Sequence, residues 1–250
     1  MAKSSKHART DREQVVAQLR AEQKAAERRR GTIIVVACVL VALGIVTAAA
    51  IGPVMDSIRT STYSGKPLTD IGSPASVCQK VITKPADGNQ QHLADGSPIL
   101  YADSPPAFGK HYFTPDAMAR KFHTAQDRPA LGTLVHNEEH GYTILWYDAT
   151  AAEDSEQMDQ IKAIANTFTG TTDLRDKFKA VPWTSSDGNP FPTGQHIAFT
   201  HWSVGGVENA SAGAAQQVGV WQYCSSVSGA ALQTYLDDYP FSDSPEPNGM

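Results

Sequence analysis

The sequence predicts an α+β domain outside the cytoplasm, behind a single N-terminal transmembrane helix. Three observations lead to this fold class: an uncharged apolar stretch near the N-terminus, an order of strand-like and helix-like segments in the C-terminal half, and two widely spaced cysteines. Each pattern predicts a local element, and the order of the elements along the chain predicts the class.

The transmembrane helix is expected at residues 31–52. This stretch contains no charged residue, and its central part, 33–50, is almost entirely Val, Ile, Leu and Ala. Twenty-two helical residues span roughly 33 Å, enough to cross a hydrocarbon core of about 30 Å. A buried core helix is the alternative, but such helices are rarely apolar on every face. We therefore expect residues 31–52 to contact the lipid bilayer.

The flanking charges predict the orientation of this anchor. Residues 1–30 carry nine Lys/Arg against four Asp/Glu and end in three consecutive arginines, Arg28 to Arg30. Basic segments stay on the cytoplasmic side, so residues 1–30 are expected to form a helical cytoplasmic tail. A cleavable signal peptide is the competing interpretation, but both the leader and the apolar run are longer than is usual for one. The protein is thus expected in the cell membrane as a single-pass protein with its C-terminal domain extracytoplasmic.

The part of the chain beyond the anchor is acidic. From residue 56 onward there are 12 Lys/Arg and 22 Asp/Glu, a net charge of −10, which argues against nucleic acid as a partner. We expect a Ser/Thr/Gly/Pro-rich stalk at 53–75, an α+β domain at 76–241 and an acidic, Pro-containing loose tail at 242–250.

Within the domain, residues 76–130 have many turn residues, which predicts irregular structure with short strands. A further strand is expected at 131–135. The remaining strands are expected at 142–147, 177–183, 196–203 and 218–224, and the helices at 153–168 and 228–239. This order would suit the C-terminal half of a thioredoxin-like domain, although many other α+β folds share it. The chain has no Cys-x-x-Cys, so thioredoxin chemistry is not expected.

Two cysteines, Cys78 and Cys224, lie outside the apolar stretch, which itself contains Cys38. Two cysteines in an oxidising compartment usually pair, so a Cys78–Cys224 disulfide is expected. A redox-active pair or a pair of soft metal ligands is the alternative. Neither cysteine lies in a Cys-x-x-Cys or Cys-x-His arrangement, which favours the structural disulfide.

One segment carries residues with metal chemistry: His136-Asn137-Glu138-Glu139-His140. On a helix, the spacing of the two histidines places both rings on one face, where they could hold zinc or copper. The string also fits the His-x-x-Glu-His pattern of inverzincin metalloproteases. That pattern needs a long helix, whereas this segment lies between two strand-like runs and is followed by Gly141. We therefore expect a tight strand–turn–strand corner and no peptidase helix.

A third ligand would distinguish a metal site from ordinary polar loop residues, which are the alternative for this segment. His111 is the leading candidate, because a rigid Pro-Pro turn precedes it. His201 and His123 are weaker candidates for the third ligand, and His92 and His196 are weaker again.

At these residues the chain resembles the bacterial, membrane-anchored or exported family named domain of unknown function 3105. The resemblance covers roughly residues 75–248. It rests on Tyr101, Ser104-Pro105-Pro106, Gly109, His111-Tyr112, Leu134 to Asn137, Glu139-His140-Gly141 and Trp146-Tyr147, and further on Ile197 to Thr200, Trp202 and Pro245-Glu246-Pro247. Two positions depart from the family pattern. Ala107 stands where the family usually has Ser or Thr, and Glu138 stands where it often has an aliphatic residue. The resemblance implies that His111, Glu139 and His140 are motif positions and that His201 is not, but it implies no reaction.

Two functions follow as hypotheses. The first is a metal-binding domain with His111, His136 and His140 as ligands of zinc or copper, and Glu139 as a fourth ligand or an orienting neighbour. No second acid/base group is placed by the sequence, so an enzymatic activity is neither assigned nor excluded. The second is a non-enzymatic accessory or assembly protein that binds a membrane protein complex, for example a respiratory or envelope complex, with the histidines in a structural role.

Overall fold

The computed structural model describes residues 3–86, 90–206 and 216–249. The chain forms two compact units, residues 1–58 and residues 59–250. The α+β fold class predicted from the sequence is confirmed, and the thioredoxin-like comparison for the C-terminal half stays a prediction.

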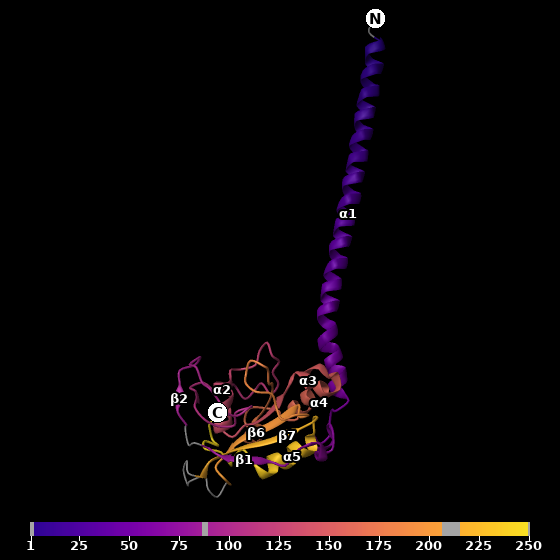
Figure 1. The fold of residues 1–250 in the computed structure, drawn as a ribbon. Coiled ribbons are helices and arrows are strands. Elements are labelled where there is room, and N and C mark those ends of the chain that lie inside the picture. Colours follow the sequence, from indigo (N-terminus) through magenta and orange to yellow (C-terminus); the bar gives the residue numbers. More distant parts are fainter. Residues whose placement is uncertain (1–2, 87–89, 207–215, 250) are drawn as a thin grey trace. The chain divides into compact units, whose positions relative to one another are not determined.

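The described part of the first unit is wholly helical and belongs to one long helix, α1 (Lys3–Ser61) (Figure 1). Its segment Glu22–Gly52 is long and apolar enough to cross a membrane, and it contains the predicted span 31–52. The apolar side chains of this span are exposed. A water-exposed helix of this composition would be unfavourable, whereas lipid solvates it on every side.

The range 53–75, expected to form a stalk, differs from that expectation. α1 continues to Ser61, and two short 3₁₀ turns follow, η1 (Leu68–Asp70) and η2 (Ala75–Val77). Between them the Ile71 side chain is buried, and the Ser73 amide donates a hydrogen bond to the Val227 carbonyl at 2.7 Å. The C-terminal part of this range therefore belongs to the folded domain, because Ile71 supplies apolar surface to its core.

The domain is built on a five-stranded sheet with the strand order β1-β7-β6-β4-β5. The strands are β1 (Ile82–Pro85), β4 (Thr143–Tyr147), β5 (Phe178–Pro182), β6 (Ile197–Ser203) and β7 (Val218–Cys224). β4 and β5 are parallel, and all other neighbours are antiparallel. A parallel pair needs a crossover connection, and here α3 (Ala149–Glu153) and α4 (Ser155–Ala165) provide it.

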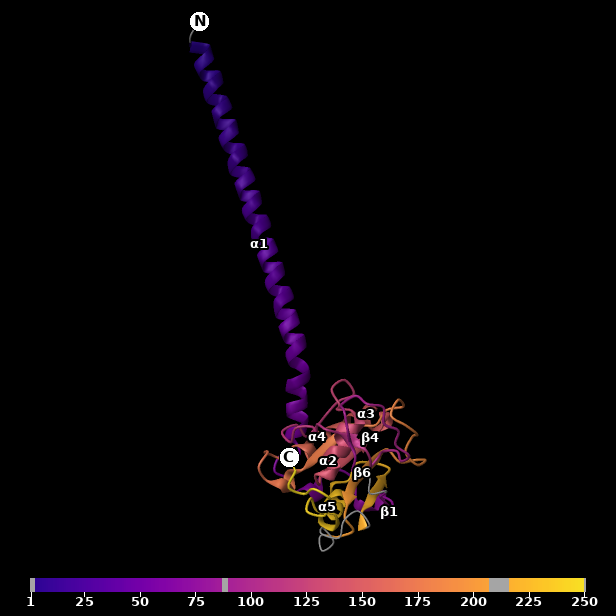
Figure 2. The same ribbon diagram turned by 90° about the vertical axis from the view of Figure 1, so that its left-hand side faces the viewer.

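The two faces of the sheet bury separate apolar clusters. On one face, α4 and α5 (Gly229–Asp238) pack against inward-facing residues of every central strand, including Leu145, Phe199 and Val220. On the other face, Trp146, Ala198 and Trp221 pack with Leu134 of α2 (Leu131–Glu139) and with loop residues. α2 lies against β6 on this second face (Figure 2). Strands buried on both faces explain why 142–147 and 196–203 lack a polar alternation.

The strand expected at 131–135 is wrong, because these residues begin α2. Leu131, Leu134 and Val135 recur at three- and four-residue spacing, which matches one face of a helix as well as a short apolar run. The tertiary structure selects the helix, since Leu134 and Val135 are then both fully buried. The expected helix 153–168 is also modified: it starts earlier, as α3, and is interrupted at Asp154, whose side chain accepts hydrogen bonds from the amides of α4's first turn.

The tail expected at 242–250 is not loose in its described part, 242–249. Asp243 and Ser244 are buried, and the Asp243 carboxylate accepts hydrogen bonds from Ser203 Oγ at 2.6 Å and from the Gly206 amide at 2.9 Å. The buried Lys177 ammonium donates to the carbonyls of Pro247 and Gly249, each at 2.7 Å. The C-terminal segment 240–249 is thus held against the domain by buried charge-assisted hydrogen bonds.

Cys78 and Cys224 form a disulfide, with their Cα atoms 3.9 Å apart. Cys224 is the last residue of β7, and Cys78 follows η2 and makes an isolated antiparallel bridge to it. The bond thus links the N-terminal edge of the domain to its central sheet. A disulfide is consistent with an oxidising compartment.

Candidate metal centre

The C-terminal end of α2 carries three of the predicted ligands. His136 and Glu139 lie in its last turn and His140 is its C-cap residue, so the three project from one side of the helix. Gly141, at φ +89°, then turns the chain out of the helix and into β4. The expectation of a strand–turn–strand corner is therefore corrected: a short helix presents these residues, although it is too short for the inverzincin pattern.

A two-stranded parallel ribbon brings two more histidines to the same place. β2 (His92–Leu93) pairs with β3 (His111–Tyr112) so that His92 lies directly opposite His111. Their ring centroids are 4.3 Å apart, and both rings lie within 5 Å of the His136 ring. His92 ranked among the weakest candidates in the sequence, because only this strand pairing, across 19 residues of chain, makes it a neighbour of His111.

Backbone carbonyls orient two of these rings. His111 Nδ1 lies 2.8 Å from the Gly109 carbonyl, and His136 Nδ1 lies 2.6 Å from the Tyr112 carbonyl. A carbonyl oxygen only accepts, so in each ring Nδ1 carries the proton and donates it. The Nε2 lone pairs of His111 and His136 consequently face into the cluster, which is the arrangement that metal-binding histidines adopt.

The carboxylate of Glu139 lies among these histidine rings. Its Oε2 atom is 2.9 Å from His111 Nε2 and 3.7 Å from His92 Nε2, and its Oε1 accepts a hydrogen bond from Gln90 at 2.8 Å. A nitrogen lone pair that faces a buried carboxylate oxygen repels it unless a proton or another cation lies between them. Ligand atoms of His92, His111, His136 and Glu139 all lie within 4.8 Å of one another.

The surroundings favour the protonation states that metal ligands require. Burial lowers the pKa of His136 below its ordinary value, and burial together with the neighbouring His136 lowers the pKa of His140 to about 4. Burial acts to raise the pKa of Glu139, but its neighbours His111 and Gln90 outweigh burial and lower that pKa. His136 and His140 are therefore neutral and Glu139 is ionised at pH 7, and a metal ion need displace no proton from them.

His140 lies beside this group and not within it. Its Nε2 is 3.1 Å from His136 Nε2 and 3.5 Å from Glu246 Oε2. It forms a second group of potential ligands with Glu139 and Glu246, again within 4.8 Å of one another. The structure thus brings the four predicted residues, His111, His136, His140 and Glu139, into one region. The first group consists of His92, His111, His136 and Glu139, and the second consists of Glu139, His140 and Glu246.

The other candidate histidines are engaged elsewhere. His123 Nε2 lies 3.2 Å from Asp116, His196 Nδ1 lies 2.9 Å from Asp148, and both nitrogens of the buried His201 face backbone carbonyls. None of the three belongs to either group of potential ligands among the described residues.

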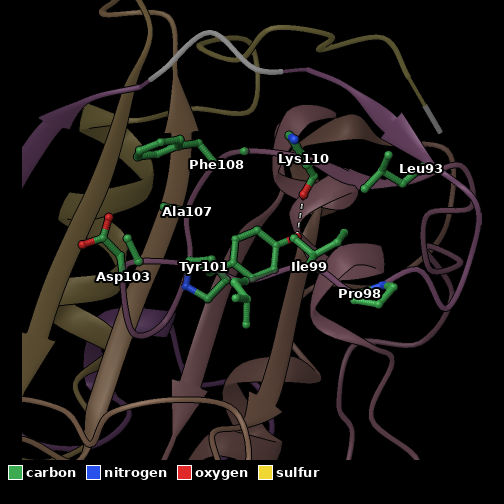
Figure 3. Close-up of a pocket in the computed structure, with 12 residues that line it drawn as sticks. Leu93, Pro98, Ile99, Tyr101, Asp103, Ala107, Phe108 and Lys110 are labelled. Carbon is green, nitrogen blue, oxygen red and sulfur yellow. Dashed lines mark hydrogen bonds between the residues drawn. The ribbon is translucent and has the colours of Figure 1, made fainter.

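A cavity of about 480 Å³ lies along the loop that leads to β3 (Figure 3). It is lined by Leu93 and Lys110, which neighbour the two ribbon histidines in sequence, and by residues 98–103 and 106–109. The Tyr101 hydroxyl donates a hydrogen bond to the Lys110 carbonyl at 2.6 Å. This bond links the two ends of the loop. None of the cluster histidines lines the cavity.

Fold and site together define an α+β domain with a buried His/Glu cluster, behind a helix that could cross a membrane. The chain belongs to the family described as protein of unknown function, DUF3105, whose model matches residues 92–249. The match begins at His92 and extends to Gly249, so it includes both groups of potential ligands. No curated protein and no solved structure matches the chain.

Proposed function

We propose that this protein binds a transition-metal ion, zinc or copper, through His92, His111, His136 and Glu139, in a domain outside the cytoplasm. The observation that carries the proposal has two parts. His111 and His136 each donate Nδ1–H to a backbone carbonyl, which leaves Nε2 free to bind a metal ion. Ligand atoms of both histidines also lie within 4.8 Å of the buried Glu139 carboxylate. Three imidazoles and one carboxylate are a donor set that suits either ion. His92 is the third imidazole ligand, in place of His140, which the sequence analysis predicted.

Metal titration of the full chain in detergent micelles tests this proposal. After chelator treatment, zinc and copper affinities are measured by competition with a chromophoric chelator. His111→Ala and His136→Ala should each weaken binding by roughly 100-fold or more, since even the loss of a neighbour that only orients a ligand costs about 10–100-fold.

His196→Ala is the matched control, because His196 is a partly exposed histidine paired with Asp148 and lies outside both groups. It should bind metal as the wild type does. Equal affinity of the wild type and both cluster variants would contradict the proposal.

The extracytoplasmic location rests on the nine basic residues that precede the apolar span, and the disulfide supports it. A reporter that is active only in the cytoplasm should be silent when fused after residue 250. The same reporter fused after residue 30 should be active. Activity of the C-terminal fusion would reverse the assigned orientation.

A further inference from the structure

The four donors of the first group leave two potential ligands unused, His140 and Glu246. Both lie beside Glu139, and ligand atoms of these three residues are within 4.8 Å of one another. His140 is only 7% exposed, and its Nδ1 has no hydrogen-bond partner among the described residues. A buried imidazole nitrogen without a partner is costly. The other nitrogen of the ring, Nε2, lies 3.5 Å from Glu246 Oε2. The ring is therefore under-satisfied beside a carboxylate, which points to a ligand.

One ion cannot take all six donors in this geometry. Two atoms bound to one zinc or copper ion at about 2.0–2.2 Å are at most about 4.4 Å apart. His140 does not come within 4.8 Å of all members of the first group. However, His136 Nε2 and His140 Nε2 are only 3.1 Å apart, so ions bound to the two groups would be neighbours.

Glu246 is a positioned residue and not a loose surface carboxylate. Its amide donates a hydrogen bond to the Glu139 carbonyl at 2.9 Å, which places it at the end of α2. Pro245 and Pro247 flank it and restrict the backbone on both sides. Lys177 Nζ ties the same segment to α2, since it donates to the carbonyls of His140 and Pro247 at 2.6 and 2.7 Å.

The C-terminal segment also fixes the His140 ring. A Cβ atom on Gly249 would lie 2.4 Å from that ring, so only glycine allows the backbone to approach so closely. The ring is thus enclosed by α2 on one side and by residues 246–249 on the other.

We propose that the cluster is a two-metal centre in which Glu139 bridges one ion held by His92, His111 and His136 and a second ion held by His140 and Glu246. This proposal rests on the proposed function. Paired ions about 3.5–4 Å apart are a common arrangement in metal centres, and a shared carboxylate suits that spacing. The second ion has three protein donors, and the Glu246 side chain is half exposed. Its remaining coordination position is open to water or another oxygen ligand, whereas four protein donors close the first site.

Metal stoichiometry of the full chain in detergent tests the two-metal centre. The protein is dialysed to equilibrium against zinc. The number of zinc ions per chain is then measured by inductively coupled plasma mass spectrometry. The wild type should hold two ions per chain and Glu246→Gln one. Asp238→Asn, which removes an exposed carboxylate of α5 outside both groups, should retain two.

A copper-loaded sample gives an independent readout. Two copper(II) ions bridged by one carboxylate couple magnetically. The wild type should therefore show a weakened electron paramagnetic resonance signal, whereas Glu246→Gln should show the full signal of an isolated copper(II) ion. One ion per chain in both proteins, with full signals, overturns the two-metal centre and leaves the first site intact. Absence of metal from the wild type overturns the first site as well.

Discussion

Cys78→Ser is expected to lower the free energy of unfolding by several kcal/mol. The disulfide joins residues 146 positions apart, and a loop of this length corresponds to about 5 kcal/mol of lost chain entropy in the unfolded state, as an upper value. Cys78 also follows the segment that places Ile71 in the core, so the bond holds the N-terminal edge of the domain against β7. The measurement is urea unfolding of the full chain, followed by fluorescence of the buried tryptophans.

Cys38→Ser is the matched control, because Cys38 is an unpaired, exposed cysteine in the apolar part of α1. It should leave the unfolding midpoint unchanged, and the reduced wild type should unfold like Cys78→Ser. A midpoint for Cys78→Ser equal to that of the oxidised wild type would falsify the assignment of a stabilising disulfide.

The second large effect is expected for Gly141→Ala. Gly141 has φ +89°, and a Cβ atom there would lie 2.3 Å from the Phe241 carbonyl oxygen and 2.8 Å from Ser244 Oγ. The variant combines left-handed backbone strain of about 1–2 kcal/mol with a steric clash of about 1–3 kcal/mol. We expect a total loss of about 2–5 kcal/mol in urea unfolding. The displaced segment 241–244 leads directly to Glu246, so the second metal ion should also be lost.

Gly96→Ala separates strain from clash. Gly96 has a similar φ of +82°, but nothing lies within 4 Å of a Cβ built on it. Its variant should therefore lose only the strain energy, about 1–2 kcal/mol, and should keep the metal stoichiometry of the wild type. Equal losses in the two variants would show that the contact between Gly141 and the C-terminal segment does not stabilise the domain.

The C-terminal segment links stability to the site. Lys177, at 2% exposed, donates to three carbonyls, those of His140, Pro247 and Gly249, and burial lowers its pKa to about 8. Its charged form is retained at pH 7 because these carbonyls replace the water that burial removes. One buried ammonium thus fixes the end of α2 and the residues around Glu246 together. The proposed second ion would bind where these two segments meet.

The sequence by itself determined the elements whose signal is local. The apolar span 31–52, the strands at 142–147, 177–183, 196–203 and 218–224 and the last helix follow from composition and period. The pairing of Cys78 with Cys224 followed from the cysteine count. The segment 131–135 was misassigned because five apolar residues fit both a strand and one helical face, and only burial against the sheet distinguishes them.

The composition of the metal site was decided by the tertiary structure. His136, Glu139 and His140 are neighbours in sequence, so their proximity was predictable from local spacing. His92 and Glu246 lie 44 and 110 residues from His136, and they reach the cluster through a two-residue strand pairing and through hydrogen bonds of the C-terminal segment. Such long-range contacts depend on register and on buried partners such as Lys177, which leave no periodic signal in the chain. For this reason the sequence predicted that a cluster exists around α2, and only the folded domain decided that His92 joins His111 and that His140 faces Glu246.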